Sequence, residues 1–170
     1  YKQVPIIIGG VEASQRTFSH FDFQKEKIKR SILFDSRADL LVNGMGEKQL
    51  IRIAEQLRAG EEMKGIQVPG TSRVINDLDR YSDTVRLPDH SQVMDQPEAL
   101  LQLEQAVMKA RSSGKILSQR VDNRYVIQYP PMNYDRQDLE RVYGFEYTRL
   151  HPKHRGLSEA LQMNLFSITS

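Results

Sequence analysis

The stretches that decide the fold read VPIIIGGVEAS at residues 4–14 and ADLLVNGMGE at residues 38–47. Each is a short run of Ile, Leu and Val that ends at a glycine turn and continues into residues suited to a helix. Buried parallel strands have this composition, and a strand, turn and helix in succession form one β/α unit. The two units predict an α/β fold with a partial, Rossmann-like parallel sheet, whose strands we expect over residues 5–9 and 39–43.

Helical spacing of apolar residues predicts three helices. The clearest covers residues 47–59 and ends at Gly60, as a C-terminal cap would. A second begins at Pro97, a residue that suits the first helical position, and a short third over 136–142 is capped by Asp135. The apolar stripe predicted for the first helix consists of Leu50, Ile53, Ala54 and Leu57.

The rest of the chain is predicted in less detail. Residues 115–119 and 125–128 form a hairpin through a turn between them, and residues 65–68 form a short strand before a Pro-Gly turn. Phe21, Ile28 and Ile32 recur at helical spacing, which favours a helix in the later half of residues 15–34. The interval 71–96 is expected to be an irregular connection.

Composition excludes several classes of site. The chain has 170 residues, with 24 basic and 22 acidic side chains and no cysteine. It therefore cannot supply a disulfide or a thiolate ligand to a metal or an iron–sulfur cluster, and a cytoplasmic location is expected. Because the basic and acidic residues nearly balance, the charge does not indicate that the chain binds nucleic acid. The densest basic run, residues 25–30, is interpreted as a solvated helix face. No apolar stretch is long enough to predict a membrane span.

Histidines do not indicate a metal site. His151 and His154 have a spacing that can bind a metal on a helix, but Pro152 between them argues against a helix there. His20 and His90 are isolated in the sequence. No serine-nucleophile, zinc-protease or phosphate-loop motif is present, so the chain is not expected to be an enzyme by itself.

The glycine turns carry the candidate site, because open α/β sheets hold ligands at the carboxyl ends of their strands. Backbone N–H groups of such turns can approach an anion or the edge of a cofactor. A structural explanation is also open, in which the glycines supply special backbone conformations, Ser14 caps a helix, Glu12 fixes a loop and Glu47 faces a positive helix end. The candidate cofactor-binding residues are Gly9, Gly10, Glu12, Ser14, Gly44, Gly46 and Glu47.

Residues 4–14, 30–47 and 117–131 resemble the N-terminal region of the YgiQ-type (UPF0313) radical S-adenosylmethionine (SAM) proteins. The resemblance covers essentially the whole chain and is specific through the pair of glycine blocks. It implies that these blocks are similar to the last strand–turn units of the cobalamin-binding-like fold that precedes many radical SAM cores. Cobalamin itself is not implied, because the chain lacks the D-x-H-x-x-G motif.

The resemblance also implies a domain organisation. Residues 1–70 would be the C-terminal half of a Rossmann-like domain, and residues 97–157 a helix–hairpin–helix extension. Residues 158–170 would begin the radical SAM core, in which a C-x-x-x-C-x-x-C motif binds a [4Fe–4S] cluster that cleaves SAM. Cluster and SAM would thus belong to a longer parent enzyme of unknown substrate, and no cofactor is expected in this chain.

These implications lead to one main hypothesis and two alternatives. The chain would be an accessory region that packs beside the radical SAM core of the same polypeptide. It would otherwise be a stand-alone module that binds a small ligand or nucleotide, or a structural interaction domain. Both ends look abrupt, as in an internal piece of a longer protein, and open strand edges of a divided sheet would favour a homodimer.

Overall fold

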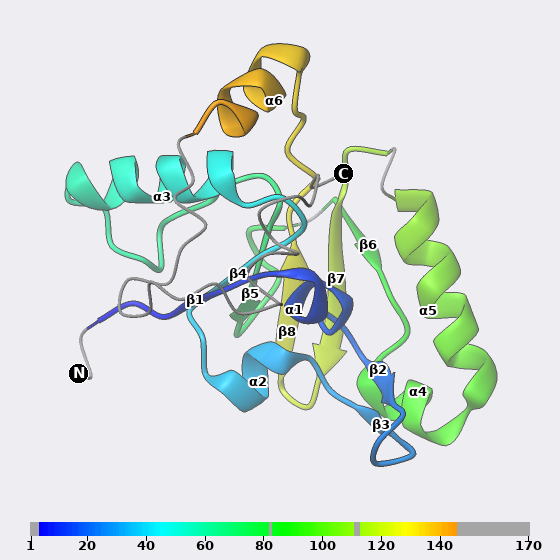
Figure 1. The fold of residues 1–170 in the computed structure, drawn as a ribbon. Coiled ribbons are helices and arrows are strands. Elements are labelled where there is room, and N and C mark those ends of the chain that lie inside the picture. Colours follow the sequence, from blue (N-terminus) through cyan, green and yellow to red (C-terminus); the bar gives the residue numbers. More distant parts are fainter. Residues whose placement is uncertain (1–3, 82, 111–112, 146–170) are drawn as a thin grey trace, which may run out of the picture. The chain divides into compact units, whose positions relative to one another are not determined.

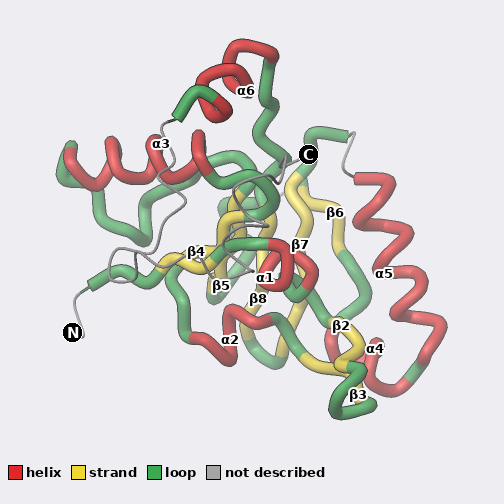
Figure 2. Tube along the Cα trace, viewed as in Figure 1, coloured by secondary structure: helices red, strands yellow, loops and turns green. Residues whose placement is uncertain are grey.

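The computed structural model describes residues 4–81, 83–110 and 113–145, and divides the chain into two compact units. The first unit, Tyr1–Asn133, contains a six-stranded sheet with the strand order β1-β4-β5-β8-β7-β6, and a separate two-stranded sheet (Figure 1). The described part of the second unit, Tyr134–Ser170, contains the short helix α6 (Arg136–Tyr143). Figure 2 shows the strands of the first unit with helices between them.

The strands are short. Their bounds are β1 (Ile7–Ile8), β2 (His20–Asp22), β3 (Lys27–Lys29), β4 (Leu40–Val42), β5 (Thr71–Ile75), β6 (Thr84–Arg86), β7 (Ile116–Val121) and β8 (Arg124–Gln128). The helices of the first unit are α1 (Val11–Gln15), α2 (Ile32–Ser36), α3 (Glu47–Arg58), α4 (His90–Asp95) and α5 (Pro97–Ala110).

The two strands predicted from the glycine blocks are neighbours in the sheet. β1 and β4 pair in parallel, with Ile7 opposite Leu40 and Ile8 opposite Leu41. β6 and β7 form a second parallel pair at the other edge, whereas β4–β5, β5–β8 and β8–β7 are antiparallel. The predicted α/β class and the parallel pairing of the first two strands are therefore confirmed, within a sheet of mixed direction.

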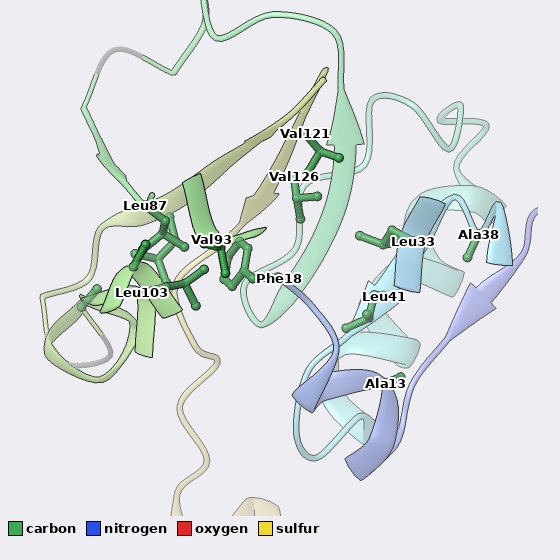
Figure 3. Close-up of a cluster of buried hydrophobic side chains, with 13 residues drawn as sticks. Ala13, Phe18, Leu33, Ala38, Leu41, Leu87, Val93, Leu103, Val121 and Val126 are labelled. Carbon is green, nitrogen blue, oxygen red and sulfur yellow. The ribbon is translucent and has the colours of Figure 1, made fainter. Parts of the chain in front are cut away.

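Side chains of β4 alternate between the two faces of the sheet, as strand geometry requires. Leu41 belongs to a large buried cluster with residues of α1, α2, α4 and α5, drawn in Figure 3. Leu40 and Val42 belong to a second cluster with Ile53 of α3. The sheet thus lies between α3 on one face and α1, α2, α4 and α5 on the opposite face, which is why its middle strands are buried on both sides.

The helices predicted at 47–59, from Pro97 onward and at 136–142 are present. α3 ends at Arg58 with Gly60 just beyond it, α5 begins at Pro97, and Asp135 caps α6 by accepting a hydrogen bond from Asp138 N. The buried face of α3 differs from the prediction. Gln49 and Ile53 are buried, whereas Leu50 is 49% exposed, so the face is rotated toward a polar residue that the hydrophobic pattern could not identify.

The prediction that residues 71–96 are irregular is wrong, because they contain β5, β6 and α4. β5 begins with Thr71, Ser72 and Arg73, which are buried but polar. The apolar run by which a buried strand is predicted is therefore absent from its sequence. The strand predicted at 65–68 does not form. The Arg73 guanidinium donates to the carbonyl oxygens of Met63, Lys64 and Ile66 at 3.2, 2.7 and 3.0 Å, which holds this segment as a loop.

The helix predicted in the later half of residues 15–34 is also wrong, apart from the single turn of α2. Phe21 and Ile28 face each other across the β2–β3 hairpin. The Asp22 carboxylate accepts hydrogen bonds from Gln24 N and Lys25 N, which fixes the turn. A spacing of seven residues suits two helical turns as well as this hairpin pair, and the basic run at 25–30 therefore lies on a hairpin rather than a helix.

The predicted hairpin is confirmed as β7 and β8, but it is not part of an extension that starts at residue 97. β8 pairs with β5 as well as β7, so the hairpin occupies the middle of the sheet. The break expected at residue 70 likewise falls inside the first unit. The segments 146–157 and 158–170, with His151 and His154, lie outside the described residues.

Candidate functional site

The two glycine turns lie side by side because the strands that precede them are parallel neighbours. A Cβ placed on Gly9 would lie 3.7 Å from the Cβ of Val42, the last residue of β4. The turns after β1 and β4 therefore share the carboxyl edge of this part of the sheet, as the sequence predicted. We call residues 9–14 and 43–47 together the rim.

Ser14 joins the two halves of the rim. Its hydroxyl donates to the Gly10 carbonyl oxygen at 2.8 Å and accepts a hydrogen bond from Gly44 N at 3.1 Å. Ser14 is not the N-terminal cap that the sequence suggested, since it lies inside α1 and Gly10 occupies the cap position. Its role in the structure is to fix one turn against the other.

Asn43 anchors the rim to buried residues of the first unit, a role that the sequence analysis missed. Its side-chain oxygen lies 2.8 Å from Thr17 Oγ1, and its amide nitrogen donates to Ser72 Oγ at 2.7 Å. Thr17 and Ser72 are 3% and 0% exposed, so these bonds satisfy hydroxyls that water does not reach. The available signal was an asparagine between a strand and a glycine, but its partners lie 26 and 29 positions away.

The glycines of the rim leave backbone uncovered. Gly10 and Gly44 have φ of 92° and 69°, a region that side-chain-bearing residues rarely adopt, and no atom lies within 4 Å of a Cβ built on either. Gly46 occupies the cap position of α3, with Glu47 as the first helical residue. The conformational explanation of these glycines is thus supported by geometry, while the backbone around them stays accessible.

Glu12 is directed to its own helix rather than to the neighbouring turn. Its carboxylate pairs with Arg16 at 3.1 Å, one helical turn along, and its side chain is 74% exposed. An exposed pair of this kind contributes little to stability. All seven predicted site residues thus lie at the rim, and the hydrogen bond from Gly44 N to the Ser14 hydroxyl joins its two turns.

A serine–histidine pair occurs away from the rim, between Ser19 Oγ and His90 Nδ1 at 2.8 Å. Burial lowers the pKa of His90, and it also lowers that of His20, whose Nδ1 lies 3.1 Å from the Phe18 carbonyl oxygen. Ser19 is only 1% exposed, and its own N–H donates to the buried Gln119. A substrate could not reach this hydroxyl, so the pair is a structural contact between the residue that precedes β2 and the start of α4.

The residues of this chain do not fit an iron–sulfur cluster. The sequence has no cysteine, and within residues 4–81, 83–110 and 113–145 no group of three or more His, Asp or Glu side chains could hold a metal ion. No helix in that same part of the chain is long and apolar enough to cross a membrane. The rim offers backbone N–H groups, the Ser14 hydroxyl, the Asn43 amide, the exposed Glu12 carboxylate and the half-buried Glu47 carboxylate.

Comparison with known proteins assigns the family. The model of the family described as radical SAM N-terminal matches residues 1–167. The chain belongs to this family. The radical SAM N-terminal assignment confirms the resemblance noted in the sequence, and it agrees with the α/β fold described above.

Curated relatives of this radical SAM N-terminal chain carry the family name UPF0313. The UPF0313 protein MJ1155 of Methanocaldococcus jannaschii is 35% identical, over 91% of this chain and 26% of its own length. UPF0313 proteins of Clostridium botulinum and Clostridium perfringens are 36% and 37% identical over the whole chain and 27% of their own length. The chain thus spans about a quarter of these relatives. No solved structure gives a significant match.

Proposed function

We propose that this chain is the accessory N-terminal region of a radical SAM enzyme, and that the [4Fe–4S] cluster and SAM are bound by a core in the same polypeptide. The family match over residues 1–167 is the observation that carries the proposal. The absence of cysteine from the chain is consistent with it, because every thiolate ligand would then come from the core. The chain's own contribution is to shape and cover that core rather than to catalyse.

We propose further that the rim contacts the radical SAM core of the same polypeptide. Val11, which begins α1, is 76% exposed, and Met45 in the other turn is 43% exposed. Apolar side chains on adjacent turns, next to uncovered glycine backbone, are suited to burial against another part of a protein. The Ser14 link and the Asn43 anchor hold the two turns in fixed relation, which lowers the entropy lost when such a contact forms.

Hydrogen–deuterium exchange tests this assignment of the rim. We expect the backbone amides of residues 9–14 and 43–47 to exchange more slowly in the full-length polypeptide than in the 170-residue chain alone. Val11→Asp in the full-length polypeptide should remove that protection while leaving the chain folded, because Val11 is already exposed. Leu101→Asp is the matched control, since Leu101 is 61% exposed on α5, and it should leave the protection unchanged.

Cluster reconstitution tests the wider proposal. After anaerobic reconstitution with iron and sulfide, the full-length polypeptide should acquire the absorbance of an iron–sulfur cluster and bind SAM. A full-length polypeptide that stays free of iron would refute the radical SAM assignment, whatever the rim contacts. Equal exchange rates at the rim in both samples would refute only the proposed contact.

Cofactor binding by the rim itself is the alternative function, and a substitution at Ser14 tests it. Ser14→Ala removes the link between the turns without changing their exposed backbone. Calorimetric titration of the 170-residue chain with SAM or ATP would support a stand-alone binding module if it gave saturable binding that Ser14→Ala weakens. Absence of binding would favour the accessory role.

A further inference from the structure

A cavity of about 580 Å³ lies on the α2 side of the sheet, away from the residues of the rim. Its lining comes from α2 and the residues on either side of it, from Val74 of β5 and from Arg124 at the start of β8. The volume falls in the range of small-molecule sites. We call it the arginine pocket, and its lining residues are Arg30, Leu33, Phe34, Asp35, Arg37, Ala38, Val74 and Arg124.

Charge distinguishes the arginine pocket from an ordinary surface depression. Three guanidinium groups and one carboxylate line it, which leaves two positive charges in excess. The carboxylate is already used, because Asp35 pairs with Arg30 at 3.0 Å. Within the described parts of the chain, neither Arg37 nor Arg124 has an ion pair. Two cations that face one cavity without counter-charges are suited to an anion.

Phe34 holds two of these arginines in place. The Cζ atom of Arg124 lies 4.6 Å from the centre of the Phe34 ring, and that of Arg30 lies 5.4 Å from it. A guanidinium over an aromatic face is attracted to the ring, but its N–H groups point outward from its edge and stay available as donors. The ring therefore orders the side chains without using the hydrogen bonds that a ligand would need.

Arg37 stands at a position where its backbone is unfavourable. It caps the C-terminus of α2 with φ of 55° and ψ of 28°, the left-handed conformation in which glycine or asparagine is usual. Residues with backbone strain of this kind cluster at functional sites. Leu33, Ala38 and Val74 supply an apolar floor beside the three cations.

From these observations we propose that the arginine pocket binds a small molecule through a phosphate group. Guanidinium donors match phosphate oxygens, and a phosphate dianion balances the two excess positive charges. An apolar part of the ligand would rest on the floor formed by α2 and β5. This site is separate from the rim, and it does not depend on the function proposed for the rim.

Calorimetric titration of the 170-residue chain with inorganic pyrophosphate tests the proposal. We expect saturable binding that weakens as salt is added, and about a tenfold loss of affinity in Arg124→Gln, since each guanidinium supplies charge-assisted hydrogen bonds. Arg52→Gln is the matched control. Arg52 is exposed on α3, on the opposite side of the sheet, and its loss should leave the affinity unchanged.

Arg37→Gly separates binding from folding. Glycine relieves the backbone strain at this position, so the melting temperature should equal or exceed that of the wild type, whereas pyrophosphate affinity should fall about tenfold. No saturable binding by the wild type, or an equal loss in Arg52→Gln, would overturn the proposal. A single-stranded oligonucleotide that binds more tightly than pyrophosphate, through the exposed Phe23, would also overturn it. That result would assign the arginines of the pocket to nucleic-acid binding.

Discussion

Asn43→Leu should destabilise the first unit by about 3 kcal/mol. The substitution keeps the size of the side chain but removes its bonds to Thr17 and Ser72, at 2.8 and 2.7 Å. Each bond contributes about 1 kcal/mol, and the Ser72 hydroxyl, which is 0% exposed, then loses the Asn43 amide as its donor at a cost of about 1 kcal/mol more. For a unit of this size the melting temperature should fall by about 10 °C.

Urea unfolding of the purified chain, followed by circular dichroism, measures this loss. Asn76→Leu is the control, because Asn76 is exposed in the loop after β5, and it should change stability by less than about 0.5 kcal/mol. Combining Asn43→Leu with Ser72→Ala should cost about 1 kcal/mol less than the sum of the two single changes. Additive effects, or a loss below about 0.5 kcal/mol in Asn43→Leu, would refute the anchoring role of Asn43.

Two further substitutions test the core and its pH dependence. Arg73→Met should lower the free energy of unfolding in urea by about 3–5 kcal/mol, because three carbonyl oxygens lose a buried cationic donor. Arg86→Met is the control and should change it very little, because Arg86 is exposed. Equal losses in the two variants would contradict this prediction. Burial lowers the pKa of His90 below its ordinary 6.5, so the unfolded chain takes up more protons and stability should fall as the pH drops through 6.5. His90→Gln should flatten that fall between pH 7 and 5, and an unchanged pH profile would show that His90 does not cause it.

The glycine blocks allowed the first β/α units to be predicted because their signals are local. Apolar composition, glycine at the strand end and helical spacing all occur within a few residues of one another, and β1, β4 and α3 follow them. β5 was missed because its first residues are polar, and their burial depends on Asn43, Met63 and other partners elsewhere in the chain. Propensity cannot detect a strand that tertiary hydrogen bonds stabilise.

The rim was predictable in position, whereas its internal contacts were not. Parallel strands with adjacent turns follow from two β/α units, but the bond from Ser14 to Gly44 spans 30 positions and leaves no trace in either block. The arginine pocket was still less accessible to sequence reasoning. Arg124 is brought to Phe34 by the pairing of β8 with β5, and the basic run that ends at Arg30 was interpreted only as a solvated face.

The placement of β5 between β4 and β8 affects how the chain is made. Ile75 pairs with Tyr125, so the backbone groups on one side of β5 have no partner until about 50 further residues have been synthesised. At about 5–20 residues per second this delay on the ribosome lasts several seconds. During that time β5 and β4 form an open template to which another nascent chain could bind, and slowing translation across α4 and α5 should therefore increase the yield of insoluble protein.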